Sequence, residues 1–189
     1  SSKTKCASSI KIASVLAQSK KVVFLAPTHA LVDQLTNDLS EMFPSELLGS
    51  SVSSDFDLLL KMDIALPEIE VMTPERCLAI ISFSPDSFED VGLLVFDECH
   101  LLSPEAGKIR RALDGMLCVL GFNEIAPQAD MLFLSAMIKN GDEFAKWIEE
   151  LTGRQCLNIE LLWKPSRQAR GVVIYNNEEL EQVKRNAIM

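Results

Sequence analysis

The sequence predicts an α/β fold in which a mostly parallel sheet lies between helices on both of its faces. Unbroken apolar runs at residues 22–26, 93–96 and 131–134 suit strands that are buried on both sides. Segments with the apolar spacing of amphipathic helices lie between these runs, and the chain shows no internal repeat. This alternation is typical of βα units that wind into a three-layer domain.

Prolines mark two of the expected boundaries in the first half of the chain. Pro27 ends the first apolar run, and Pro74 occupies the first turn of a helix, where proline is favoured. The expected elements are a helix ending near Gln18, a strand at 22–26, a helix from Thr28 to Pro44, a loop at 49–54, a short helix at 55–63, a strand at 70–73 and a helix at 74–82.

The second half continues the same series. The expected elements are a turn at 85–90, a strand at 93–96, a helix from Pro104, a loop at 121–130, a strand at 131–135, a helix at 144–151, strands at 156–163 and 171–175, a basic extended segment at 164–170 and a polar helix at 178–188. Gly153 is expected to cap the helix that precedes it. The inner face of the helix after Pro104 is expected to carry Ile109, Ala112, Leu113, Met116, Leu117 and Leu120.

The composition describes a globular chain. With 189 residues, of which 48% are hydrophobic and 24% charged, the chain is long enough for one domain with a sizeable core. No apolar run approaches the ~20 residues that a membrane helix needs, so we expect no membrane partner. The five cysteines are scattered without a CxxC pair, which argues against a disulfide framework and a structural zinc site. They favour a reducing intracellular compartment, the cytoplasm or the nucleus.

Two acids, Asp97 and Glu98, directly follow the apolar run at 93–96. An unpaired buried charge is costly, so both acids are expected just beyond the carboxyl end of the strand, where open α/β sheets bind ligands. One interpretation is a solvated loop. The other is a Mg²⁺-nucleotide site in which Asp97 holds the metal and Glu98 deprotonates an attacking water. A phosphate-binding element elsewhere in the chain would decide between them.

Lys3 and Thr4 stand at the head of the first predicted helix, as in the end of a GxxxxGK[ST] loop. In that loop, backbone amides cradle phosphates, the lysine reaches phosphate oxygens and the hydroxyl binds Mg²⁺. The glycines of the motif are absent here, and Ser2 precedes Lys3. Taken alone, Ser-Lys-Thr is more often a surface turn.

Read in order, however, five short motifs resemble the first motor domain of superfamily 2 helicases of the DExH-box group, a RecA-like P-loop NTPase fold. They are Lys3-Thr4 (end of motif I), Ala26 to Gln34 (motif Ia), Thr73-Pro74-Glu75-Arg76 (motif Ib), Asp97-Glu98-Cys99-His100 (a DECH form of motif II) and Ser135-Ala136-Met137 (motif III). The segments at 133–136 and 143–147 look most like the Ski-type branch.

The resemblance implies ATP and Mg²⁺ as cofactors and single-stranded DNA or RNA as partner. The implied roles are nucleotide binding for Ser2, Lys3, Thr4, Asp97 and Glu98, metal binding for Thr4 and Asp97, base catalysis for Glu98, a coupling contact between His100 and Ser135, and a nucleic-acid track at Thr28, Gln34, Thr73, Pro74 and Arg76. The net charge of −9 is a weak counter-argument, because amides and hydroxyls also grip phosphates. Taken alone, Thr73-Pro74-Glu75 is an ordinary helix start.

The sequence departs from the family pattern in three ways. Ser2 replaces a glycine, Met137 replaces the threonine of motif III, and motifs IV to VI do not follow. We therefore expect residues 1–163 to form the first motor domain and residues 164–189 to lead, as a basic linker and helix, toward a second RecA-like domain. Because that domain would carry arginine fingers, this fragment alone is expected to hydrolyse ATP very poorly.

The expected function is that of an ATP-dependent helicase or translocase. The main alternative is a nucleic-acid-binding or scaffold protein whose catalysis is weakened, as Ser2 and Met137 suggest. A more distant alternative is a P-loop ATPase that acts on proteins or small molecules, which would leave motifs Ia and Ib unexplained.

Overall fold

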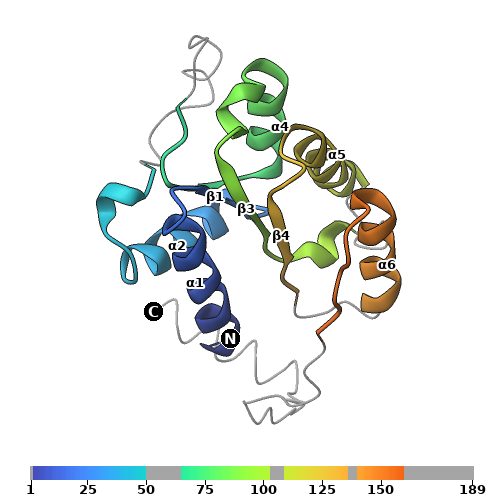
Figure 1. Ribbon diagram of the computed structural model, residues 1–189, viewed down its shortest axis with the longest axis horizontal. Helices are drawn as coiled ribbons and strands as arrows, with labels where there is room; N and C mark the ends of the chain where they lie inside the picture. Colours follow the sequence, from blue (N-terminus) through green and yellow to red (C-terminus); the bar gives the residue numbers. More distant parts are fainter. Residues whose placement is uncertain (1, 50–64, 103–108, 136–139, 160–189) are drawn as a thin grey trace, which may run out of the picture. The chain divides into compact units, whose positions relative to one another are not determined.

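The computed structural model describes residues 2–49, 65–102, 109–135 and 140–159. Within them, the sheet has four parallel strands in the order β2-β1-β3-β4 (Figure 1). The strands are β1 (Lys21–Leu25), β2 (Ile69–Met72), β3 (Val91–Phe96) and β4 (Asp130–Phe133). The predicted α/β fold class is confirmed.

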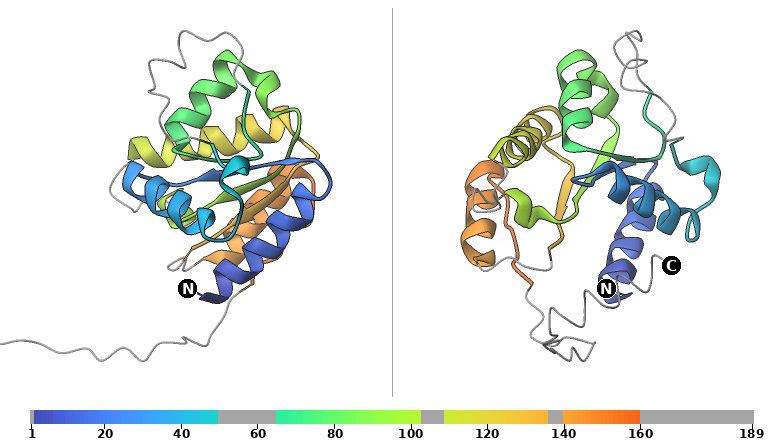
Figure 2. Two further views of the ribbon diagram at one scale, coloured as in Figure 1. Left: turned by 90° about the vertical axis from the view of Figure 1, so that its left-hand side faces the viewer. Right: turned by 180° about the vertical axis from the view of Figure 1, so that it is seen from behind.

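Helices cover both faces of this sheet. They are α1 (Ser2–Leu16), α2 (His29–Ser40), α4 (Pro74–Phe83), α5 (Ile109–Ile125) and α6 (Gly141–Thr152), with short 3-10 turns η1 (Ser45–Leu47), η2 (Pro85–Phe88) and η3 (Cys99–Leu102). Figure 2 shows α4 and α5 on one side of the sheet and α1 and α2 on the other. The alternation of side chains along each strand produces these two layers.

The alternating strand residues feed two separate apolar cores. In one core, Val23 and Leu94 pack with residues of α4, α5 and α6. In the other, Val22 and Leu93 pack with residues of α1 and α2. Neighbours in sequence therefore contribute to opposite faces, which explains why the strands are continuous apolar runs.

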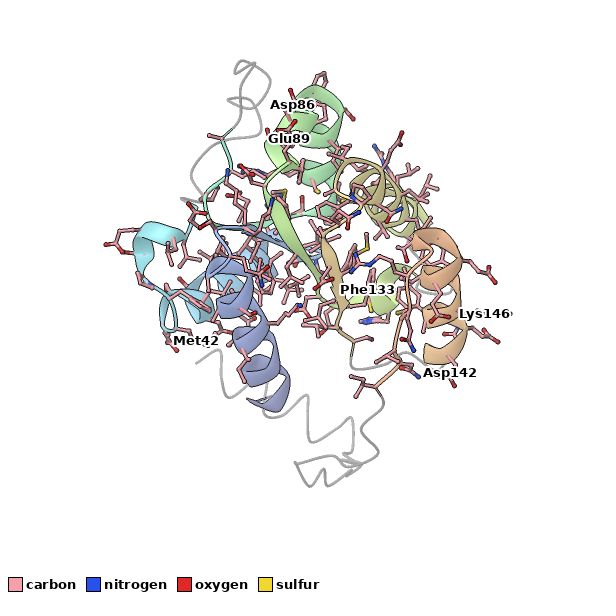
Figure 3. The ribbon with its side chains drawn as sticks, viewed as in Figure 1. Met42, Asp86, Glu89, Phe133, Asp142 and Lys146 are labelled. Carbon is pink, nitrogen blue, oxygen red and sulfur yellow. The ribbon has the colours of Figure 1, made fainter. Side chains whose placement is uncertain are left out.

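Aromatic rings connect β4 to its neighbours. Phe133, labelled in Figure 3, stacks on Phe96 of β3 at 6.4 Å between ring centroids and meets Phe144 of α6 edge-on at 5.2 Å. Asp142 and Lys146 project outward from the same helix (Figure 3). Gly153 ends α6 in the left-handed conformation with φ of 65°, as predicted for its cap.

Ion pairs join the amino end of β4 to two helices. Asp130, the first residue of β4, binds Lys11 of α1 through one oxygen and Arg154, just beyond α6, through the other. Arg154 also donates to the Ala129 carbonyl. The Lys11 ammonium, and then the Arg154 guanidinium, hold the pKa of Asp130 below its ordinary value despite partial burial. This edge of the sheet thus ties the first and last described helices to one strand.

The predicted inner face of α5 is wrong in three of its residues. Leu113, Leu117 and Leu120 are 54%, 45% and 39% exposed, whereas Ala112, Cys118, Val119 and Phe122 are buried. The apolar residues of this helix extend around much of its circumference, so periodicity did not determine which side faces the core. The helix also continues through Gly121 to Ile125, where a loop was predicted.

Two further boundaries differ from the prediction. The second helix ends at Ser40 and not near Pro44. Of the strand predicted at 156–163, the described residues 156–159 are not in a strand, and the Cys156 N–H donates to the Glu149 side chain. The predicted elements at 55–63, 164–170, 171–175 and 178–188 lie outside the described residues.

One compact unit of the chain extends to Leu157, and a second begins at Asn158. The expected boundary between residues 163 and 164 lies outside the described part of the chain. None of the helices in the described part is long and apolar enough to cross a membrane.

Candidate nucleotide and nucleic-acid site

The predicted site residues follow the ends of all four described strands. Thr28 follows β1, Thr73 follows β2, Asp97 follows β3 and Ser135 follows β4. Because the strands are parallel, their carboxyl ends meet at one edge of the sheet, which is where ligands bind in α/β folds. The sheet topology therefore gathers four motifs that lie far apart in the sequence.

Neighbouring strands fix the acidic turn at this edge. The Asp97 N–H donates to the Leu25 carbonyl at 2.9 Å, and the Cys99 N–H donates to the Leu134 carbonyl at 2.9 Å. Between them, Glu98 has a φ of 53°, a left-handed conformation that few residues other than glycine adopt. The Asp97 carboxylate accepts the Glu98 N–H at 3.0 Å. Such backbone strain is typical of functional sites.

His100 contacts two residues of this site, its expected partner Ser135 and also Glu98. Its Nδ1 lies 3.1 Å from Glu98 Oε2 and 3.4 Å from Ser135 Oγ. A single Nδ1–H can be donated to one acceptor at a time, and a neutral imidazole can instead accept there. His100 thus lies between the candidate base Glu98, just after β3, and the hydroxyl beyond β4, while the Glu98 side chain remains 36% exposed.

Cys99, between the acidic turn and His100, is a packing residue. Its side chain is 2% exposed and belongs to the core beneath α4 and α5. Burial raises the pKa of the Cys99 thiol to about 12, and the nearby Asp97 and Glu98 carboxylates add to this rise. The thiol is therefore protonated at neutral pH and chemically inert.

Two threonines at this edge follow the adjacent strands β1 and β2, and each caps the helix that comes next in the chain. Thr28 Oγ1 accepts the Leu31 N–H at the start of α2, and Thr73 Oγ1 accepts the Arg76 N–H at the start of α4, both at 3.3 Å. These caps satisfy one of the free N–H groups of each helix start. The remaining N–H groups and the helix dipoles favour anions such as phosphates.

The other predicted track residues lie on the same two helices in different environments. Gln34 is exposed on α2, and Pro74 is buried in the first turn of α4. The Arg76 guanidinium forms an ion pair with Glu70 of β2, at 3.5 Å between Nη2 and Oε1. Sequence reasoning missed Glu70, although a carboxylate within an apolar strand is itself a signal.

The nucleotide-binding residues at the start of α1 are described only by their backbone. Ser2, Lys3 and Thr4 form the first residues of this helix, and their side chains lie outside the described set, as does Met137. The other end of α1 leads into β1, and Lys11 reaches the amino end of β4. The helix therefore runs antiparallel to the strands, so its first residues are directed toward the carboxyl edge of the sheet (Figure 1).

The described residues contain no group of three or more His, Cys, Asp and Glu side chains that could hold a metal ion. For the expected Mg²⁺, Asp97 supplies the hard oxygen donor that this ion prefers, at the end of a strand. The carboxylate already accepts a backbone N–H, which keeps it oriented. The donor chemistry thus fits a Mg²⁺-nucleotide.

Two relatives share most of the chain. The Hachiman protein HamB of Bacillus cereus is 26% identical over 157 residues, covering 79% of this chain and 13% of that protein. The ATP-dependent DNA helicase Hel308 of Methanocaldococcus jannaschii is 28% identical over 167 residues, covering 86% of this chain and 12% of that protein. The chain therefore spans 12% to 13% of the length of these two relatives.

Comparison with solved structures and family models identifies the fold and the family. The DUF1998 helicase MrfA, in a crystal structure bound to DNA and AMPPNP, matches with a TM-score of 0.59 at 18% identity. The match covers 94% of this chain and 27% of MrfA, which shows a shared fold. A model of the family described as DEAD/DEAH box helicase matches residues 1–144. The chain belongs to this family, as a first RecA-like motor domain of superfamily 2.

Proposed function

We propose that this chain binds ATP with Mg²⁺ and hydrolyses it to drive a longer helicase along a single strand of DNA or RNA. The observation that carries the proposal is the meeting of Asp97, Glu98, His100 and Ser135 at the carboxyl edge of the sheet. The threonine-capped starts of α2 and α4 lie at the same edge. The proposed catalytic site and the proposed nucleic-acid track therefore follow neighbouring parallel strands.

In this proposal, the start of α1 and the end of β3 hold the nucleotide. Lys3 and Thr4 bind its phosphates and metal, with Ser2 contributing backbone, and Asp97 completes the metal site. Bound ATP with Mg²⁺ supplies the phosphoanhydride bond that is hydrolysed. Glu98 takes the proton of the attacking water, and its partly exposed carboxylate is accessible to that water.

His100 and Ser135 form the proposed link between hydrolysis and movement. A donor shared between Glu98 and Ser135 gives the site two arrangements, one in which the imidazole holds the base and one in which it holds the hydroxyl beyond β4. Exchange between them would shift β4 relative to β3 when the nucleotide state changes. Met137, beyond Ser135, removes the hydroxyl that the motif would otherwise provide.

The proposed track runs over the starts of α2 and α4. Thr28, Gln34, Thr73, Pro74 and Arg76 belong to it, and hydroxyls and helix N-termini bind sugar-phosphate without reading bases. Support for DNA comes from the relatives, because Hel308 is named a DNA helicase and MrfA was crystallised with DNA. The same backbone chemistry would accept RNA.

The remaining parts of the proposal concern the longer protein. A second RecA-like domain with arginine fingers completes the catalytic site, so the 189-residue chain alone hydrolyses ATP very poorly. Residues 164–189 lead toward that domain, and the segments at 133–136 and 143–147 support the Ski-type branch. The scattered cysteines, which include no CxxC pair, support an intracellular location.

The test measures ATP hydrolysis by the longer protein with single-stranded DNA, with single-stranded RNA and without either. The Glu98→Gln variant should lose about 10²–10⁴-fold in kcat, the usual contribution of a general base. Glu89→Gln is the matched control, because it alters an exposed acid that lies before the amino end of β3 and not at the carboxyl edge. Wild-type turnover equal to that of Glu98→Gln would refute the helicase and favour the scaffold.

A further inference from the structure

Glu70 is a charged residue in the middle of a buried strand. Its exposed fraction is 7%. Among the described residues, the buried polar or charged residues are Glu70, Thr73 and Ser84. Burial raises the pKa of Glu70, and the nearby Arg76 guanidinium opposes this rise. A buried ion pair is often no more stable than apolar residues of the same volume, so stability alone gives little reason for this one.

Arg76 links Glu70 to the start of the proposed track. Its guanidinium lies 3.5 Å from Glu70 Oε1, and the two side chains are only 17% and 10% exposed. The backbone N–H of the same residue is the donor that Thr73 Oγ1 accepts at the cap of α4. One residue thus connects the cap of the helix to a carboxylate within the preceding strand.

Space for the Glu70 carboxylate depends on Gly49. A Cβ atom at Gly49 would lie 2.3 Å from Glu70 Oε2 and 2.9 Å from the Pro67 ring, and both distances are far too short. The Gly49 N–H donates to the Ile69 carbonyl at 3.1 Å, which keeps this backbone against β2. A loop, a strand and a helix therefore each contribute to the surroundings of one carboxylate.

We propose that Glu70 is a positioning residue for nucleic-acid binding, which acts by holding the Arg76 guanidinium and thereby fixing the start of α4. In this arrangement Arg76 does not bind a phosphate itself. It keeps the Thr73 hydroxyl and the first N–H groups of α4 aligned for the sugar-phosphate backbone. The inference rests on the proposed function, since it assigns work within the same track, and it replaces the direct contact expected for Arg76.

The experiment measures binding of the longer protein to a fluorescent single-stranded oligothymidylate over a range of salt concentrations. Glu70→Gln and Arg76→Gln should each weaken binding about fivefold to tenfold, as expected for the loss of one ion pair that positions the track. The double variant should bind like either single variant, because both changes break the same link. The slope of log K against log salt should remain that of the wild type, since no phosphate contact is removed.

A further variant separates positioning from simple stability. Glu70→Met with Arg76→Met replaces the buried pair by apolar side chains, which the fold should tolerate or prefer. If the pair positions the track, this stable protein still binds weakly with an unchanged salt slope. If it binds like the wild type, the pair is only structural and the inference is wrong. Lys146→Gln on α6, away from the strand ends, serves as the control for loss of a positive charge.

Two other results would overturn the inference. A salt slope reduced by about 0.7 in Arg76→Gln would mean that Arg76 touches a phosphate directly. Tighter binding by Glu70→Gln would mean that Glu70 withholds Arg76 from the strand. Failure of the wild type to bind at any salt concentration would instead refute the proposed function, and this inference with it.

Discussion

The two edges of the sheet differ in how their acidic residues are paired. At the amino edge, Asp130 lies between two cations that tie α1 and the end of α6 to β4. At the carboxyl edge, Asp97 and Glu98 are adjacent acids in a turn with a left-handed backbone, and their contacts include a backbone N–H and an imidazole. The first edge is arranged to hold the chain together. The second keeps charge and strain that a purely structural turn would not need.

This comparison predicts a division of effects. Substitutions at the amino edge should change the free energy of unfolding and leave activity per folded molecule unchanged. Substitutions at the carboxyl edge should change activity and leave the free energy of unfolding nearly unchanged, except where a residue also caps a helix.

His100→Ala should lower the nucleic-acid-stimulated kcat of the longer protein about tenfold or more. The removed imidazole holds the carboxylate of the candidate base Glu98, and a loss of this size is part of the ~10²–10⁴-fold that a positioned general base contributes. His100→Asn keeps a donor near the Nδ1 position and should retain much of the activity. Urea unfolding should place both variants within about 0.5 kcal/mol of the wild type. A large loss of stability in His100→Ala would contradict the proposed division.

Gly92→Ala should destabilise the chain by about 1–3 kcal/mol, the usual cost of overpacking. A Cβ at Gly92 would lie 2.8 Å from Lys20 Cβ and 3.0 Å from Val15 Cγ1, near the amino edge. Gly121→Ala in α5 is the control, because its nearest neighbour is a side-chain atom at 3.3 Å and alanine favours the helix. Urea unfolding of both variants gives the measurement. Equal stabilities would show that the amino edge can relax around the added methyl group.

Thr28→Ala should cost about 1 kcal/mol of unfolding free energy, because the Leu31 N–H loses its cap. If Thr28 also binds the strand, affinity for single-stranded DNA should fall beyond what this loss explains. Thr28→Ser keeps the hydroxyl and should restore both quantities. Binding titrations and urea unfolding of the two variants would separate them. Unchanged affinity in a folded Thr28→Ala protein would restrict this residue to capping.

Asp130→Asn should destabilise the chain by less than about 1 kcal/mol at pH 7, since its ion pairs are partly exposed. The pKa of Asp130 is lowered in the folded state, so its contribution is present above the ordinary value of 3.8 and is lost as the pH falls through the lowered pKa. The difference in stability between the two proteins should therefore shrink as the pH falls below 3.8. Urea unfolding at pH 7 and at pH 3 measures this, with Asp86→Asn in an exposed turn as the control. A difference that was as large at pH 3 as at pH 7 would exclude the ion pairs as its source.

Much of the site could be predicted because it follows from strand ends. Apolar runs at β1, β3 and β4 indicated a parallel sheet, and parallel strands bring their final residues together. Asp97 and Ser135 could therefore be placed at one edge although 37 residues lie between them in the chain. The exact contacts of His100, with both Glu98 and Ser135, depend on side-chain geometry that spacing cannot give.

The errors have physical causes. Leu113 and Leu117 were assigned to the core because the apolar positions of α5 fit more than one helical face, and only packing against α4 selects one. Cys156 was assigned to a strand by its apolar neighbours, but Glu149 accepts its N–H. Glu70 was overlooked because a single acid in a short strand resembles the alternation of polar and apolar residues in a strand with one exposed face.

The left-handed backbone at Glu98 places two demands on one position. A φ of 53° is most easily adopted by glycine, while the proposed chemistry requires a carboxylate there. A change to glycine would relax the turn and remove the base. Selection for folding alone would therefore favour glycine at position 98, and selection for the proposed turnover would favour glutamate. The glutamate at this position agrees with selection for turnover.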